Sequence, residues 1–168
     1  MSKQKSSIKI VIFGNAGSGK STLANMHSDK YALPHLDLDL VAWQNTDPPK
    51  RKPIANSKVQ MSQFLNENTS WVIEGCYADL LEFVMKQANK IVFLNPGIST
   101  CISNCKKRPW EPHKYKSLVE QNKNLEMLLC WVKEYIIRKD ECSLQQHQEL
   151  YQQFSGEKVE YASNQTVT

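Results

Sequence analysis

Apolar residues along the chain fall into short runs separated by longer segments with helical spacing. The short runs are rich in β-branched and aromatic residues and predict strands at about 8–13, 33–38, 71–74, 90–95 and 157–162. The longer segments predict helices at about 20–30, 56–67, 78–88, 98–107, 117–138 and 143–154. Strands that alternate with helices are typical of a parallel sheet covered on both faces. The pattern therefore predicts an α/β fold.

Two proline-containing basic segments, residues 45–53 and 106–116, interrupt this alternation. We interpret the second as the centre of a lid at about 107–118. The 168 residues are enough for one core without metal or disulfides, and no linker or internal repeat divides the chain. We expect a single domain spanning 1–168.

The formal net charge of +4 is mild, and the 21 basic residues are spread over the chain. The charge therefore does not indicate a nucleic-acid surface, and basic groups beside phosphates explain the excess. No apolar stretch is long enough to span a bilayer, and residues 1–7 lack the apolar core of a signal peptide. We expect a cytoplasmic protein without membrane contact, as a monomer or a homodimer.

Five cysteines, Cys76, Cys101, Cys105, Cys130 and Cys142, form neither an even set nor a C-x-x-C pair. In a reducing compartment they are expected to be free thiols. Cys101 and Cys105 are four residues apart on a predicted helix, but two ligands without a second pair support zinc binding only weakly. Buried small apolar residues are the simpler interpretation.

The segment after the first predicted strand matches the phosphate-binding pattern G-x-x-x-x-G-K-[ST]. Its backbone N–H groups and the start of the next helix would hold the phosphates of ATP. Lys20 would reach the β- and γ-phosphate oxygens, and the Ser21 hydroxyl would hold Mg²⁺. The expected nucleotide contacts are Gly14, Asn15, Ala16, Gly17, Ser18, Gly19, Lys20, Ser21 and Thr22.

Acidic residues follow the next two predicted strands, at the sheet edge where ligands bind in parallel sheets. Strand alternation would place Asp37 and Asp39 on one side of the second strand, about 6–7 Å apart along it. One could order magnesium-bound water and the other accept a proton from an acceptor hydroxyl. Alternatively, Asp37 caps a turn and Asp39 is solvated. Glu74 could approach metal-bound water and Gly75 a ligand, or Glu74 could stabilise the next helix N-terminus.

Three arginines are candidates for contacts with phosphates or with the acceptor. Arg108 opens the lid and would stabilise the transferred charge. Arg138 could approach the same phosphates, or bind the C-terminal carbonyls of its own helix. Arg51 could pair with an anionic acceptor, or lie in a solvated basic turn with its neighbouring lysines.

Taken in order, these motifs resemble the small P-loop kinases of the shikimate, gluconate and adenylate kinase group. The segments Trp71–Asp79 and Arg108–Tyr115 look closer still to an uncharacterised bacterial branch described as shikimate kinase-like or simply as ATP-binding. The resemblance covers about residues 8–162, and only the phosphate loop is specific on its own.

The resemblance implies a three-layer P-loop NTPase fold of the nucleoside monophosphate kinase type, with five parallel strands in the order 2-3-1-4-5. It implies Asp37 as the magnesium-side acid and Asp39 as the contact to the acceptor hydroxyl. It also implies acceptor contacts from Arg51 and Arg138 and a lid arginine at Arg108. Together with the phosphate loop, it makes Lys20, Asp39 and Arg108 the catalytic candidates.

The chain departs from the named families after the third strand. Shikimate kinases carry three glycines and adenylate kinases an Asp-Gly-Phe-Pro-Arg motif where this chain has Glu74-Gly75-Cys76-Tyr77. Neither family's acceptor can therefore be transferred. We expect ATP- and Mg²⁺-dependent phosphoryl transfer to a hydroxyl of a small, anionic metabolite. The alternatives are a nucleoside or nucleotide kinase and an NTP-binding regulatory module with weak hydrolysis.

Overall fold

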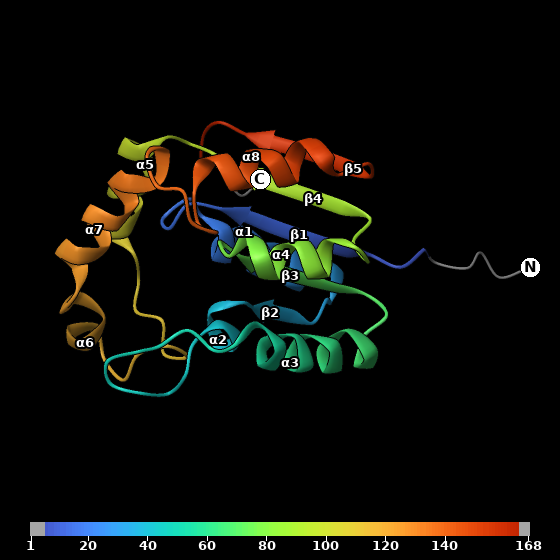
Figure 1. The fold of residues 1–168 in the computed structure, drawn as a ribbon, viewed down its shortest axis with the longest axis horizontal. Coiled ribbons are helices and arrows are strands. Elements are labelled where there is room, and N and C mark those ends of the chain that lie inside the picture. The colour runs from blue at the N-terminus through green and yellow to red at the C-terminus, as the bar shows by residue number, and fades with distance from the viewer. Residues whose placement is uncertain (1–5, 165–168) are drawn as a thin grey trace, which may run out of the picture.

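The computed structural model describes residues 6–164, which form a five-stranded parallel sheet between helices (Figure 1). The strands are β1 (Lys9–Gly14), β2 (His35–Asp37), β3 (Trp71–Gly75), β4 (Lys90–Leu94) and β5 (Glu157–Tyr161). Their order is β2-β3-β1-β4-β5, and every neighbouring pair is parallel. The predicted α/β class and strand order are confirmed, although β2 is shorter than the predicted 33–38.

The helices agree with the predicted positions except in two places. They are α1 (Lys20–Tyr31), α2 (Asp39–Ala42), α3 (Ile54–Glu67), α4 (Ala78–Met85), α5 (Ile98–Lys107), α6 (Leu118–Asn122), α7 (Leu125–Lys133), the 3-10 turn η1 (Glu134–Ile136) and α8 (Leu144–Gln153). The single helix predicted at 117–138 is wrong, because Asn124 leaves helical geometry and begins α7 as its N-cap residue. The short helix α2 was not predicted.

Both faces of the sheet are buried, as the alternation of β1 shows. Val11 and Phe13 pack on the side covered by α3, α4 and α8, while Ile10 and Ile12 pack against α1. Successive side chains of a strand point to opposite faces, so a strand that is apolar throughout needs a layer on each side. The result is the three-layer arrangement seen in Figure 1.

The helices α5, α6 and α7 lie beyond the carboxyl ends of the strands, at the left of Figure 1. Val132 of α7 packs on Cys101 and Cys105 of α5, which joins the two helices. The lid segment, residues 107–118, leads from the end of α5 to α6. These elements therefore enclose the sheet edge at which ligands bind in open parallel sheets.

A buried histidine packs against the adjacent strands β1 and β4 near their carboxyl ends. His147 packs edge-on against the stacked rings of Phe13 and Phe93 and is inaccessible to solvent. Its Nε2 lies 2.7 Å from the Cys76 carbonyl oxygen, which can only accept, so Nε2 carries the proton and Nδ1 accepts from the Tyr135 hydroxyl at 2.7 Å. Burial lowers the pKa of His147 to about 4. The imidazole is therefore neutral near pH 7.

The cysteines are free thiols, as predicted, and only Cys130 is exposed. The closest approach is between Cys76 and Cys142, whose sulfurs are 3.6 Å apart. Within residues 6–164, no helix is both long and apolar enough to cross a membrane.

Candidate functional site

The loop at residues 14–21 joins β1 to α1 and is shaped by glycines. Gly17 and Gly19 have φ of 74° and 93°, values that residues with a side chain rarely adopt. A Cβ atom on Gly17 would lie 2.4 Å from the Cys101 carbonyl oxygen and 2.6 Å from the Cys105 sulfur. The loop therefore follows the surface of α5 so closely that only glycine fits.

Polar contacts fix the loop from three sides. The buried Asn15 side chain donates to the Val132 carbonyl at 3.1 Å, and Asn104 donates to the Gly17 carbonyl at 2.8 Å. Lys20 Nζ donates to the Asn15 carbonyl at 2.7 Å. The buried Ser18 hydroxyl has no hydrogen-bond partner among residues 6–164. A loop with an unpaired buried donor, a lysine and a helix N-terminus fits a phosphate group.

A carboxylate lies directly beside this loop. Glu74, buried at the end of β3, accepts a 2.7 Å hydrogen bond from Ser21 Oγ. His35 Nε2 is 3.6 Å from the same carboxylate oxygen. Burial opposes ionisation, but the nearby His35 imidazole, the charge of Lys20 and the hydrogen bond from Ser21 hold the pKa of Glu74 below its ordinary value. Glu74 is therefore an anion next to the hydroxyl expected to hold Mg²⁺.

Two further carboxylates lie after β2 and, with Glu74, form what we call the acid cluster. Asp37 is the last residue of β2, whereas Asp39 begins α2, and the Asp39 amide donates to Asp37 Oδ1 at 2.9 Å. The prediction that strand alternation aligns them is therefore wrong. A turn brings them together, and Lys114 of the lid segment bridges them, with Nζ 2.8 Å from Oδ2 of each.

The acids of this cluster differ in how readily they ionise. Burial, together with the charges of Glu74 and Asp39, raises the pKa of Asp37 above its ordinary value, and Lys114 offsets only part of this. Burial also opposes ionisation of Asp39, yet the charge and hydrogen bond of Lys114 and a hydrogen bond from Tyr77 hold its pKa low. Asp39 is therefore the more readily ionised of the two aspartates, and as an anion it can accept a hydrogen bond or a proton.

A chain of hydrogen bonds holds the other oxygen of Asp39. The Tyr77 hydroxyl donates to Asp39 Oδ1 at 2.6 Å and accepts from Trp43 Nε1 at 2.7 Å. Tyr77 is buried, and its pKa is raised by burial and by nearby Cys76 and Asp39. Asp39 thus has a fixed orientation, with Tyr77 on one oxygen and Lys114 on the other.

Arg51 lies next to this chain, but its charge is already paired. Its guanidinium is 4.6 Å from the centre of the Tyr77 ring and bonds Asp79 at 3.2 Å and Glu141. Contact with an anionic acceptor would require Arg51 to exchange at least one of these partners.

Arg138 is also internally bound. It stacks on the Trp131 ring at 3.7 Å, donates to the Trp131 carbonyl at 3.1 Å and pairs with Glu134 at 3.2 Å. Its side chain is only 7% exposed. The structure thus places Arg138 in the alternative role, at the carbonyls of its own helix region.

Arg108 remains within the lid segment. Its guanidinium is 3.4 Å from Glu111 and 5.9 Å from the centre of the Tyr115 ring. Lys114, rather than Arg108, is the lid cation that reaches the acid cluster.

Gly75, expected near a ligand, makes room for the Leu38 side chain. A Cβ atom at position 75 would lie 2.7 Å from Leu38 Cβ.

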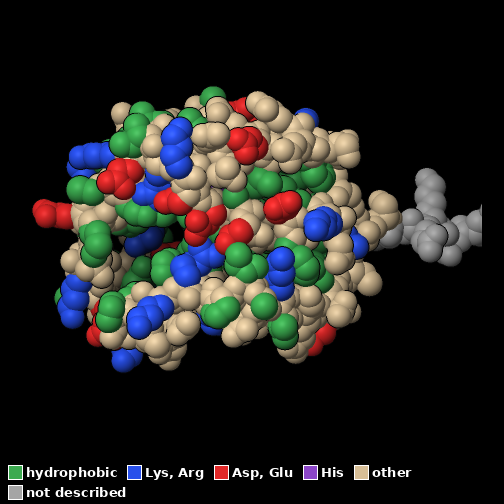
Figure 2. Space-filling model, in the orientation of Figure 1, with side chains coloured by type: hydrophobic (Ala, Val, Ile, Leu, Met, Phe, Trp, Pro, Cys, Tyr) green, Lys and Arg blue, Asp and Glu red, His purple; other side chains and the backbone are tan. Residues whose placement is uncertain are grey.

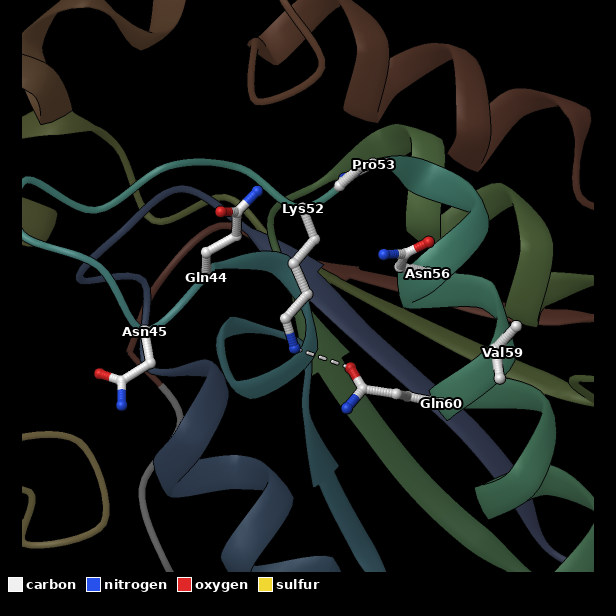
Figure 3. A pocket seen from close by; sticks show the side chains of 7 residues that line it. All are labelled: Gln44, Asn45, Lys52, Pro53, Asn56, Val59 and Gln60. Carbon is white, nitrogen blue, oxygen red and sulfur yellow. Dashed lines mark hydrogen bonds between the residues drawn. The ribbon is translucent and has the colours of Figure 1, made fainter.

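Figure 2 shows a hollow between the α6–α7 side of the molecule and its centre, with basic and acidic side chains at its rim. A separate open cavity of about 520 Å³ lies between the chain at 44–53 and α3 (Figure 3). Its lining is Gln44, Asn45, Lys52, Pro53, Asn56, Val59 and Gln60. Lys52 donates to Gln60 at 2.8 Å across one wall. None of the predicted site residues lines this cavity.

Within the part of the chain that the structure describes, no group of three or more His, Cys, Asp or Glu side chains could hold a metal ion by itself. Magnesium in phosphoryl-transfer sites is instead held by one or two protein ligands and the substrate phosphates. Ser21, Asp37 and Glu74 supply oxygen ligands of this type.

The sequence did not identify Lys114, Tyr77, Trp43 or Asn104 as site residues. Lys114 lies 75 positions from Asp39, and nothing in spacing marks it among the other basic residues of the lid segment. Tyr77 could have been found, because it follows the third strand at the same sheet edge as Glu74.

No protein-family model matches the chain, and no curated protein matches it. Among solved structures, an uncharacterised protein from Eubacterium ventriosum gives a TM-score of 0.48 at 16% identity, over 91% of this chain and 87% of its own. TT1252 from Thermus thermophilus gives a TM-score of 0.53 at 14% identity, over 94% of this chain and 90% of its own. The likeness to TT1252 shows that this fold occurs in a solved structure, and nothing further about either protein.

Proposed function

We propose that this chain is a P-loop phosphotransferase that moves the γ-phosphoryl group of ATP to a hydroxyl of a small metabolite. The observation that carries the proposal is the Ser21–Glu74 hydrogen bond, which joins the phosphate-type loop to the acid cluster. Phosphoryl transfer needs a phosphate cradle, a metal-side acid and an acceptor-side acid within a few ångström of one another. The fold class and the strand order are compatible with this group of kinases.

In this proposal the loop amides and Lys20 bind the phosphates. Lys20 would leave the Asn15 carbonyl, which it now contacts at 2.7 Å, for the β- and γ-phosphate oxygens. The Ser21 hydroxyl would hold Mg²⁺, together with the carboxylates of Glu74 and Asp37 in the acid cluster. When bound, Mg²⁺ neutralises phosphate charge and aligns the transferred group. Arg108 would supply further positive charge from the lid segment.

Asp39 is the proposed proton acceptor. Tyr77 and Lys114 each bind one of its oxygens, and each oxygen keeps a second lone pair with which to receive an acceptor O–H. Because the transition state of phosphoryl transfer is loose, orienting the hydroxyl matters more than base strength. The hydrogen-bond chain from Trp43 through Tyr77 therefore contributes by fixing this carboxylate.

The acceptor would bind between Asp39 and the chain at 43–53. An anionic acceptor is compatible with this placement only if Arg51 exchanges Asp79 or Glu141 for it. Arg138 is bound to Trp131 and Glu134, and Gly75 is covered by Leu38. Of the predicted substrate contacts other than Asp39, Arg51 therefore needs the least rearrangement.

The test is a screen of hydroxyl compounds with γ-labelled ATP and Mg²⁺, covering sugar acids, neutral polyols, amino alcohols and nucleosides. We expect label transfer to one class, and we expect Lys20→Ala to reduce it at least about 10²-fold through lost charge stabilisation. Lys30→Ala, at the other end of α1, is the matched control. Failure of every class, or full activity of Lys20→Ala, would contradict the proposal.

A regulatory NTP-binding module is the second candidate. Apolar side chains are exposed on the α6–η1 side, including Val119 at 73% and Ile137 at 69%. Such residues can mark a partner surface. Slow ATP hydrolysis without transfer to any compound in the screen would favour this candidate.

A further inference from the structure

Lys114 of the lid segment lies against the acid cluster. Its ammonium nitrogen lies 2.8 Å from Oδ2 of both Asp37 and Asp39, and 3.5 Å from Glu111 Oε1. The side chain is only 14% exposed. Two carboxylate oxygens thus converge on one internal cation at the edge of the acid cluster.

The lid segment presents Lys114 through a folded turn that has its own support. Trp110 Nε1 donates to the Tyr115 carbonyl at 2.8 Å. The buried Gln121 accepts from the Glu111 amide at 2.9 Å and donates to the Pro109 carbonyl at 3.0 Å. These contacts do not involve the acid cluster, so removal of the Lys114 charge would release the turn without dismantling it.

Other basic side chains near the acid cluster are placed differently. Lys20 donates to the Asn15 carbonyl, and His113 Nε2 is 3.6 Å from Asp37 Oδ2. In the described part of the chain, Lys114 is the only cation within 3 Å of both Asp37 and Asp39. Converging carboxylate oxygens are the ligands that hard divalent cations prefer. The ammonium therefore lies where such a cation would compete for the same oxygens.

We propose that Lys114 latches the lid segment onto the acid cluster, and that its ammonium and a divalent cation exclude each other at Asp37 and Asp39. A cation that binds these oxygens must displace Lys114, which frees the lid. The biological meaning rests on the proposed function, since the latch would keep free divalent cations from Asp37 and Asp39 until nucleotide phosphates draw Lys114 away. The latch itself requires neither ATP nor an acceptor.

The test uses the full chain and Mn²⁺ alone, a paramagnetic probe whose binding is measured by electron paramagnetic resonance. We compare the wild type with Lys114→Met and with Lys116→Met, which removes an exposed lysine of the same segment. We expect Lys114→Met to bind Mn²⁺ at least about tenfold more tightly, within the usual range of coupling between two sites. Lys116→Met should bind as the wild type does.

Hydrogen exchange of the amides at 109–116 gives a second readout. Coupling is reciprocal, so Mn²⁺ should accelerate exchange there in the wild type. Lys114→Met should exchange fast before metal is added, with no further change after it. The wild-type measurement needs no variant, so it remains decisive if Lys114→Met does not fold.

Two results would overturn the latch. One is Mn²⁺ affinity in Lys114→Met equal to or weaker than in the wild type, and the other is slower lid exchange when the wild type binds Mn²⁺. Because no nucleotide is present, either result leaves the phosphotransferase proposal untouched. Conversely, failure of the acceptor screen would leave the latch standing.

Discussion

The loop at 14–21 and the acid cluster face each other across the Ser21–Glu74 hydrogen bond, but they are held in different ways. The loop is fixed mainly by backbone geometry and by hydrogen bonds to backbone carbonyls, through Gly17 against α5, Asn15 against Val132 and Lys20 against Asn15. The acid cluster is fixed by charge, chiefly through Lys114. We therefore expect the loop to be sensitive to shape and the acid cluster to be sensitive to charge and pH.

The largest expected effect tests the acid cluster. Asp39→Asn keeps the shape of the side chain but removes its charge and basicity. We expect transfer to fall by about 10²–10⁴-fold, the range for a lost positioned base, with nearly unchanged ATP affinity. Steady-state kinetics and calorimetric ATP titration measure the two quantities separately.

Asp37→Asn provides the comparison within the same cluster. It should raise the Mg²⁺ concentration needed for half-maximal activity, because the acid on the metal side is weakened. If Asp39→Asn transfers normally while Asp37→Asn is inactive, Asp39 is not the base and Glu74 becomes the better candidate.

The second prediction tests the shape of the loop. Gly17→Ala places a Cβ 2.4 Å from the Cys101 carbonyl at a φ of 74°. Overpacking costs about 1–3 kcal/mol and the left-handed conformation about 1–2 kcal/mol, so we expect the free energy of unfolding to fall by about 2–5 kcal/mol. Urea denaturation measures the loss.

Gly19→Ala is the matched control, since its φ is 93° but nothing lies within 4 Å of its added Cβ. It should lose only the conformational part, about 1–2 kcal/mol. Equal losses in the two variants would show that close packing against α5 does not shape the loop.

The same division explains what could be read from the sequence. The loop and the strand order follow from local patterns, because glycine spacing and strand–helix alternation are properties of neighbouring residues. The acid cluster depends on contacts between distant segments, such as Lys114 with Asp39, which no periodicity encodes. The break at Asn124 was missed because the helical pattern of apolar residues continues across it.

A third prediction concerns His147, a neutral buried group that binds the Cys76 carbonyl just after β3. Burial lowers the pKa of His147 to about 4. Between pH 6.5 and pH 4, His147 is therefore protonated in the unfolded chain but neutral in the folded chain. The contribution to stability is complete above pH 6.5 and is lost as the pH falls toward 4, in all about 3 kcal/mol. Urea denaturation across this window measures it.

His147→Gln is the control for the histidine, since glutamine keeps an N–H donor for the Cys76 carbonyl without titrating. Because the variant lacks the titrating imidazole, its free energy of unfolding should fall less between pH 6.5 and pH 4, by up to about 3 kcal/mol. An unchanged pH dependence would mean that the pKa of His147 in the folded protein is not lowered.

The smallest expected effect concerns the neutral support of a charged group. Tyr77→Phe removes the 2.6 Å hydrogen bond to Asp39, one of the contacts that hold the Asp39 pKa low. The Asp39 pKa should therefore rise, and since the ionised form is the base, activity should be lost at a higher pH as the solution is acidified. We therefore expect the acid limb of kcat to shift to higher pH, as measured by the pH dependence of kcat.

Trp43→Phe separates this effect from packing, because it removes the donor to Tyr77 and leaves the bond from Tyr77 to Asp39 in place. Its acid limb should move less than that of Tyr77→Phe. Equal shifts in both variants would mean that the aromatic pair acts by packing, whereas a shift confined to Tyr77→Phe would show that a single hydroxyl tunes the acid cluster. The loop makes none of the hydrogen bonds that these variants remove, so ATP should bind equally well in both.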